Sequence, residues 1–105
     1  GDSLDKAEQM SYKTIKAEPT NSTYLDTYAW ILYMQKRYAE AKVYIEQALA
    51  CDSLPSVDIL DHAGDIMYRN NMTDEAVALW KRALKQSPDN KIITRKIKLK
   101  KIIKK

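Results

Sequence analysis

The sequence repeats itself at a spacing of 34 to 35 residues, and this periodicity limits the folds open to the chain. Ala7, Ala41 and Ala76 each begin the same pattern, in which small or apolar residues follow at helical spacing. Twelve residues after each alanine comes a proline or a serine that can end the segment. Segments of this length that recur in phase are typical of helical repeats, which bury their apolar faces against one another.

The stretch 24–52 predicts two amphipathic helices joined by a turn. Apolar residues recur at helical spacing in its first half, and again after Gln35-Lys36-Arg37. The two inward faces are Leu25, Tyr28, Ala29 and Leu32, then Ala41, Tyr44, Ile45, Ala48 and Leu49. The small residues in both faces let helices approach to about 8 Å, so we expect an antiparallel hairpin.

Similar patterns predict helices on both sides of this hairpin. A helix over 3–17 opens the chain without a hairpin partner before it, and a second hairpin follows Ser56, which can cap its first helix. Asn70-Asn71 marks the turn, because asparagine tolerates left-handed backbone, and Thr73 is predicted to cap the next helix. The inward residues of this hairpin are Leu60, Ala63, Gly64 and Met67, then Ala76, Leu79, Trp80, Ala83 and Leu84.

The first helices of the two hairpins follow one spacing. The patterns L-x2-Y-A-x2-L at 25–32 and L-x2-A-G-x2-M at 60–67 stand where the tetratricopeptide repeat has W-x2-L-G-x2-Y. The chain therefore resembles the tetratricopeptide repeat family over residues 1–90. The second copy is the closer match, because it has Gly64 and Pro88 where the first has alanine and serine.

The resemblance implies an all-α fold, a right-handed α-solenoid of antiparallel hairpins in one domain, 1–105. We expect about 2.5 repeats: half a repeat over 1–21, full repeats over 22–55 and 57–90, then a basic capping helix over 91–105. The scarcity of glycine (two residues) and proline (three) agrees with helices. The resemblance also indicates the C-terminal repeats of a longer bacterial protein, and leaves open whether that protein is cytoplasmic or in the cell envelope.

The chemistry of the side chains does not indicate an enzyme. There is no Gly-rich phosphate loop, no second histidine and no nucleophile with a base in reach. Asp58, Asp61, His62 and Asp65 have the spacing of a metal site on one helix, but a pairing of Asp58 with His62 on an exposed helix face is the simpler interpretation. We predict no metal and no cofactor. The single cysteine, Cys51, excludes an internal disulfide and is assigned to packing.

In the family that this chain resembles, the first helices of successive hairpins line a concave groove that binds protein segments. The matching positions are Thr23, Asp26, Trp30, Tyr33 and Met34 in one repeat, and Asp58, Asp61, Asp65, Tyr68 and Arg69 in the next. We therefore expect a non-catalytic scaffold that binds a peptide or protein, with Trp30, Tyr33 and Tyr68 as anchors. The alternative for Trp30 and Tyr33 is packing against an adjoining helix.

The acidic residues of this predicted groove indicate which ligands it selects. Asp58, Asp61 and Asp65 are expected to select basic groups on a partner. The chaperone-binding branch of the family holds a terminal carboxylate with basic and asparagine side chains, and the acids here disfavour such a ligand.

The basic residues gather at the end of the chain. Residues 91–105 contain eight Lys/Arg and no acid, whereas 1–90 contain ten Lys/Arg against fourteen Asp/Glu. We expect a capping helix whose Ile92, Ile93 and Ile97 dock on the Trp80 helix. The alternative function is contact with a membrane surface or nucleic acid, of which nucleic acid is disfavoured because the segment has no aromatic residue to stack on bases.

The helix over 3–17 leaves one face without a predicted neighbour. Other repeats of the parent chain could cover it, and so could a second copy through self-association.

Overall fold

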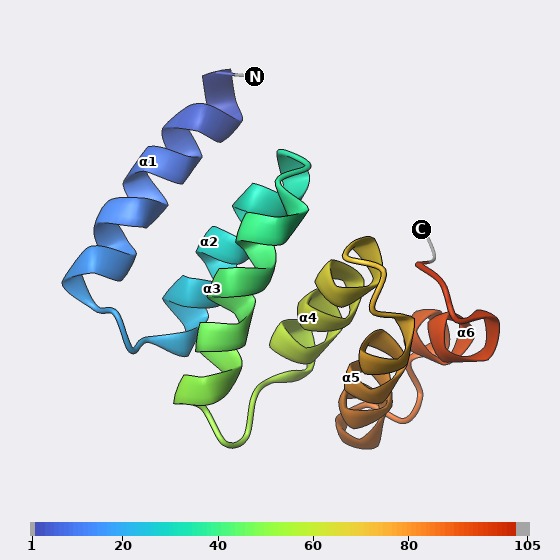
Figure 1. The fold of residues 1–105 in the computed structure, drawn as a ribbon. Helices are drawn as coiled ribbons and strands as arrows, with labels where there is room; N and C mark the ends of the chain where they lie inside the picture. Colours follow the sequence, from blue (N-terminus) through green and yellow to red (C-terminus); the bar gives the residue numbers. More distant parts are fainter. Residues whose placement is uncertain (1, 103–105) are drawn as a thin grey trace. The chain divides into compact units, whose positions relative to one another are not determined.

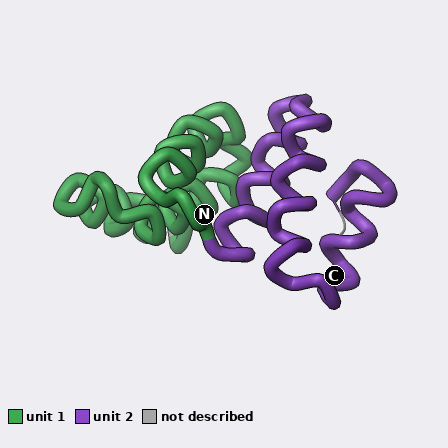
Figure 2. The backbone as a smooth tube through the Cα atoms, turned by 90° about the horizontal axis from the view of Figure 1, so that it is seen from below, with its two compact units in different colours: residues 1–55 green, residues 56–105 purple. Residues whose placement is uncertain are grey.

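The computed structural model describes residues 2–102, and this range folds into six helices and no strand (Figure 1). The helices are α1 (Asp2–Ala17), α2 (Ser22–Met34), α3 (Tyr38–Cys51), α4 (Val57–Arg69), α5 (Thr73–Gln86) and α6 (Lys91–Leu99). The predicted all-α fold is confirmed. Within 2–102, no helix is both long and apolar enough to cross a membrane. The chain divides into two compact units, residues 1–55 and 56–105 (Figure 2), which are described separately.

The core of the first unit is the seam between α2 and α3. Leu25, Ala29 and Leu32 of α2 are buried there, and so are Ala41, Ile45 and Ala48 of α3, as the apolar periodicity predicts. The chain reverses at Lys36, whose φ of 63° lies in the left-handed region. Cys51 is the last residue of α3 and is exposed, so its assignment to packing was wrong. It lies beyond Ala48, the last buried residue of this helix.

The entry to α2 is fixed by a side-chain cap. The Asn21 Oδ1 atom accepts a hydrogen bond from the Tyr24 N–H at 3.0 Å. Replacing Asn21 with alanine is expected to lower the free energy of unfolding by about 1 kcal/mol, because one N–H of the first turn loses its partner. Chemical denaturation measures this change, with Thr20→Ala in the exposed turn as the control. Equal effects of the two substitutions would show that the cap contributes nothing.

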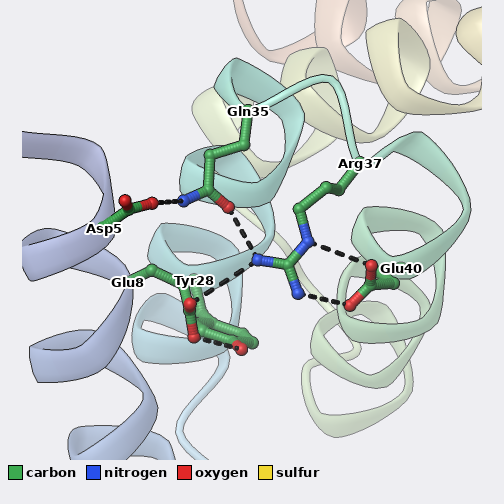
Figure 3. A network of polar contacts seen from close by, with 6 residues as sticks. All are labelled: Asp5, Glu8, Tyr28, Gln35, Arg37 and Glu40. Atoms are coloured by element: carbon green, nitrogen blue, oxygen red, sulfur yellow. Dashed lines mark hydrogen bonds and ion pairs between the residues drawn. The ribbon is translucent and has the colours of Figure 1, made fainter. Parts of the chain in front are cut away.

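A polar network joins α1 to the α2–α3 hairpin (Figure 3). Arg37 donates to both oxygens of Glu40, at 3.0 and 2.6 Å, and pairs with Glu8 of α1 at 3.5 Å. The Tyr28 hydroxyl donates to Glu8 at 3.0 Å. Burial, and then the hydrogen bond to Glu8, raise the pKa of Tyr28. The hydrogen bond from Arg37 lowers the pKa of Glu40. The first shift favours the protonated Tyr28 hydroxyl, which donates to Glu8, and the second favours the ionised Glu40 carboxylate, which accepts from Arg37.

The second unit is built around the seam between α4 and α5. Leu60, Ala63 and Ile66 of α4 are buried against Ala76, Trp80 and Ala83 of α5. Ser56 caps α4, because its Oγ atom accepts from the Ile59 N–H at 3.3 Å, and Asn71 makes the turn with a φ of 62°.

The predicted cap of α5 was wrong. Met72 holds the cap position without a side-chain hydrogen bond, and Thr73 is already the first helical residue. The turn decides this, since the Met72 N–H bonds back to the Met67 carbonyl at 3.0 Å and so places Met72 at the start of the helix.

Helix α6 packs on α5 and is shorter than the basic segment. Asn90 caps it, and Ile93 is buried, as the predicted capping helix requires, while Ile92 and Ile97 are half-buried. The helix ends at Leu99, where Lys100 adopts a left-handed conformation with a φ of 54°. The prediction of a helix through 100–102 was therefore wrong, because the apolar stripe does not continue there. The predicted continuation through 103–105 lies outside the described residues.

Candidate protein-binding site

The C-terminal end of α2 carries an aromatic surface. The rings of Trp30 and Tyr33 are stacked, with centroids 4.3 Å apart and planes at 6° to one another. Tyr38, at the start of α3, meets Tyr33 edge-on with centroids 5.4 Å apart. Trp30 and Tyr33 are half-buried, and the neighbouring Met34 is 47% exposed. Three of the five predicted groove residues of this helix therefore form one apolar surface, which we call the α2 aromatic surface (Trp30, Tyr33 and Met34).

The other two predicted groove residues of α2 differ from one another. Thr23 is exposed, and its backbone carbonyl accepts a hydrogen bond from the Thr27 hydroxyl at 3.0 Å. Asp26 is buried, with only 8% of its surface exposed. Thr23 is thus available to a partner, whereas little of the Asp26 side chain is.

The predicted groove residues of α4 belong to the second unit. Asp58 lies exposed in the first turn of the helix, where a carboxylate complements the helix dipole. Tyr68 and Arg69 lie at the other end and line a hollow of about 210 Å³ with Asn71 and Thr73. The ring of Tyr68 also contacts the buried Trp80, with centroids 6.3 Å apart. Asp58, Tyr68 and Arg69 therefore keep exposed or partly exposed side chains.

Asp61 and Asp65, the two remaining acids of α4, are bound by a lysine of the same unit. The Lys96 Nζ atom lies 2.8 Å from the Asp61 carboxylate, and 3.0 and 3.3 Å from the two oxygens of Asp65. The Trp80 indole N–H also donates to Asp65, at 3.2 Å. Asp65 is 7% exposed and Lys96 is 4% exposed, so this cluster is an internal ion pair that joins α6 to α4.

The electrostatics of this Lys96 cluster (Asp61, Asp65, Trp80 and Lys96) favour a charged lysine. Burial by itself would lower the pKa of Lys96, but the hydrogen bond to Asp61 and the charge of Asp65 outweigh it, and the pKa is raised. For Asp65, burial raises the pKa, and the charge of Lys96 opposes that rise. Lys96 is therefore the group that most opposes the effect of burial on the pKa of Asp65.

The role of Lys96 was not predicted. Asp61 and Asp65 were instead expected to select basic groups on a partner. One signal was available. Ile92, Ile93 and Ile97 were expected to dock on α5, and Lys96 lies among them at helical spacing, on the side of α6 that faces the protein.

The possible metal ligands do not assemble into a site in the part of the chain that the structure describes. In residues 2–102, no three His, Cys, Asp or Glu side chains are arranged to hold a metal ion. Asp61 and Asp65, two of the four side chains with metal-like spacing, contact the Lys96 ammonium group instead.

Comparison with solved structures decides the fold. The first TPR domain of Spaghetti (RPAP3), bound to the HSP90 peptide SRMEEVD, superposes with a TM-score of 0.86 at 20% identity, over 94% of this chain and 78% of that chain. The fold is that of a tetratricopeptide repeat domain. The first TPR domain of human RPAP3 agrees, with a TM-score of 0.82 at 21% identity over 92% of this chain and 76% of that one.

A third similar structure is a much larger assembly. The structure of Naa15/Naa10 bound to HypK-THB matches with a TM-score of 0.74 at 25% identity, over 92% of this chain but only 15% of the matched chain. No protein-family profile and no curated protein sequence matches this chain. The bacterial origin and the C-terminal place in a longer protein therefore stay predictions.

Proposed function

We propose that this tetratricopeptide repeat domain is a non-catalytic scaffold that binds another protein, and that α2 supplies the anchors. The α2 aromatic surface carries the proposal. In this surface the Trp30 and Tyr33 rings are stacked and the neighbouring Met34 is exposed. Trp and Tyr are enriched among the residues that supply most of the binding energy at protein interfaces, and Met is enriched at interfaces as well. Apolar surface of this kind is costly to leave in water, so a partner that covers it gains from its burial.

The structural neighbours support a protein or peptide as the ligand. One of them is described as bound to an HSP90 peptide and another as bound to HypK-THB. The peptide SRMEEVD carries three acidic residues and one basic residue. Asp58 is exposed on α4 of the present chain, so we expect a partner segment that contacts α4 to carry basic rather than acidic groups there.

Seven of the ten predicted groove residues keep a role in binding within this proposal, and the other three are assigned to contacts within the protein. In the first unit, Trp30, Tyr33 and Met34 are the apolar anchors and Thr23 is an accessible polar position. In the second unit, Tyr68 is an anchor of its own, and Asp58 and Arg69 are accessible polar positions. Asp61 and Asp65 are assigned to the internal ion pair with Lys96, and Asp26 to the protein interior.

Replacing Trp30 with alanine is expected to weaken partner binding by about 2 kcal/mol, because a rigid aromatic anchor is lost. The helical circular dichroism signal should stay the same. Binding is measured by capture of partners from a cell extract through a photo-crosslinker at position 39, an exposed alanine next to Tyr38. Leu54→Ala is the matched control, since it removes an apolar side chain that is 85% exposed outside this surface. Unfolding of the Trp30 variant would show that Trp30 belongs to the core.

The alternative function uses α6. The exposed cations of this segment give it a basic surface and are Lys91, Arg95, Lys98, Lys100 and Lys101. Lys96 does not contribute to it, because it is held in the ion pair with Asp61 and Asp65. Such a surface could bind an anionic membrane or nucleic acid. Sedimentation with vesicles containing anionic lipid, tested against Lys91→Glu and Arg95→Glu, distinguishes it from the scaffold function.

A further inference from the structure

A hollow on the first unit lies between α1, α2 and α3. Its volume is about 310 Å³, and Ile15 of α1 and Leu25 of α2 contribute buried apolar side chains to it. Two tyrosines also line it, Tyr12 from α1 and Tyr44 from α3. We call this hollow the tyrosine cleft, and its remaining lining residues are Lys16, Pro19 and Gln47. Three helices of one unit and the connection after α1 therefore supply its lining.

A third tyrosine holds the two rings of the cleft in place. The ring of Tyr28, in α2, contacts that of Tyr12 with centroids 5.7 Å apart and that of Tyr44 with centroids 4.7 Å apart. Tyr28 is buried, and its hydroxyl donates to Glu8 in the polar network that joins α1 to the hairpin (Figure 3). The core thus positions the rings of Tyr12 and Tyr44, so a ligand does not have to order them on binding.

The cleft also carries hydrogen-bonding groups that the fold leaves unused. In residues 2–102, neither the hydroxyls of Tyr12 and Tyr44 nor the side-chain amide of Gln47 makes a hydrogen bond within the protein. These groups can donate to the backbone carbonyls of a ligand. A polyproline II segment suits them, because its backbone has no internal hydrogen bonds and its carbonyls remain free to accept. A helix suits them less, because most of its carbonyls are already bonded.

The aromatic rings and the charge of the cleft define the ligand further. Aromatic-lined grooves are surfaces on which proline-rich segments dock, and such segments lose little conformational entropy on binding. Among the described residues that line the cleft, Lys16 is the only charged one. It is exposed, and its Nζ atom lies 5.5 Å from the centre of the Tyr12 ring. An acidic residue next to the prolines of a ligand therefore complements the cleft.

We infer that the tyrosine cleft binds a proline-rich partner segment in the polyproline II conformation, with an acidic residue beside its prolines. The prolines pack on Tyr12 and Tyr44, and their carbonyls accept from the Gln47 amide. The acid pairs with Lys16. A second copy of this chain does not supply such a segment, because its three prolines are isolated from one another in the sequence. The cleft shares no residue with the α2 aromatic surface, so this inference stands or fails independently of the proposed function.

The test is an NMR titration of the isotope-labelled whole chain with a peptide of consecutive prolines followed by glutamates, with capped ends. Binding is expected to shift the signals of the Gln47 side-chain amide and of the Tyr12 and Tyr44 rings. A peptide with alanines in place of the prolines should bind about tenfold more weakly, because it has to be ordered on binding. A peptide with lysines in place of the glutamates should lose a similar factor, because its charge repels Lys16.

Variants of the protein locate the peptide in the cleft. Lys16→Glu should weaken binding about tenfold, while Lys13→Glu, a matched change at an exposed lysine of α1 outside the cleft, should not alter it. Gln47→Ala should also weaken binding, because the peptide carbonyls lose a donor. Trp30→Ala should leave binding unchanged, which separates this cleft from the α2 aromatic surface. Circular dichroism establishes that the variants stay folded.

Three results would overturn the inference. The first is the absence of binding by the proline–glutamate peptide, and the second is equal binding by the alanine peptide, which would show that the cleft does not select polyproline II. The third is binding that is indifferent to both Lys16→Glu and Gln47→Ala, because the peptide would then lie elsewhere on the protein.

Discussion

Replacing Lys96 with methionine is expected to lower the free energy of unfolding by about 3 kcal/mol at neutral pH, because a buried carboxylate loses its counterion. Lys96 lies within 3.3 Å of both oxygens of Asp65. Methionine fills a similar volume, so the loss measures the charge rather than a cavity. Asp65 would keep only the Trp80 indole N–H, a neutral donor at 3.2 Å. Denaturation in urea measures the change, and Lys98→Met on the exposed side of α6 is the matched control.

The pH dependence identifies the mechanism. The pKa of Asp65 is raised by burial, and losing Lys96 raises it further. A carboxyl group whose folded pKa is raised stabilises the fold most below its unfolded pKa, about 3.9, and loses that contribution as pH rises through the folded value. The deficit of Lys96→Met should therefore shrink on acidification from pH 7.5 to pH 4.5, because Asp65 takes up a proton.

At high pH the wild-type protein should lose the stability that Lys96 contributes. The pKa of Lys96 is raised by its two carboxylates, so its contribution is complete below the unfolded value of about 10.4 and is lost as pH rises through the folded value. The stability difference between wild type and Lys96→Met should thus fall above about pH 10.4. Adding Asp65→Asn to Lys96→Met should recover stability at pH 7.5. A deficit that is the same at every pH would show that the loss comes from packing.

Replacing Gly64 with alanine is expected to cost about 2 kcal/mol of folding stability. A Cβ atom at Gly64 would overlap the Nε1 and Cδ1 atoms of the Trp80 ring. Trp80 is fully buried and its indole N–H donates a hydrogen bond to Asp65. Moving the ring would therefore break this hydrogen bond and disturb the packing of the core. Overpacking of this kind destabilises the fold by about 3 kcal/mol, and the higher helix propensity of alanine offsets about 1 kcal/mol of that loss.

A double-mutant cycle tests whether Trp80 causes this loss. The aligned pair in the first hairpin is Ala29 and Ile45, in which a smaller partner leaves room for the methyl group. Trp80→Ile alone should destabilise by about 3 kcal/mol through a cavity. Gly64→Ala with Trp80→Ile should cost less than the two single changes added, with a coupling of about 1 kcal/mol or more. Exact additivity in urea denaturation would show that the two side chains do not conflict.

Most of the helices could be predicted from the sequence, because helix periodicity and caps are local properties. The apolar stripe of α4 and its cap at Ser56 involve residues within a few positions of one another, and both are present in the structure. The pattern of small residues also indicated the hairpin partners, since close packing of two helices requires such residues on the facing sides. The cap of α5 was missed because the preceding turn, rather than the presence of a threonine, decides which residue comes first.

The sequence by itself determined the all-α repeat fold and the buried seams, such as Ala41 and Ile45 against α2, because helical spacing alone assigns these residues to one face. Only the tertiary structure decided which charges remain available to a partner. Asp58, Asp61 and Asp65 share one helix face in the sequence, yet Asp58 is exposed while Asp61 and Asp65 bind Lys96, which lies 35 and 31 residues further along the chain. Such a pairing depends on where α6 docks, and helical periodicity carries no information about contacts at that separation.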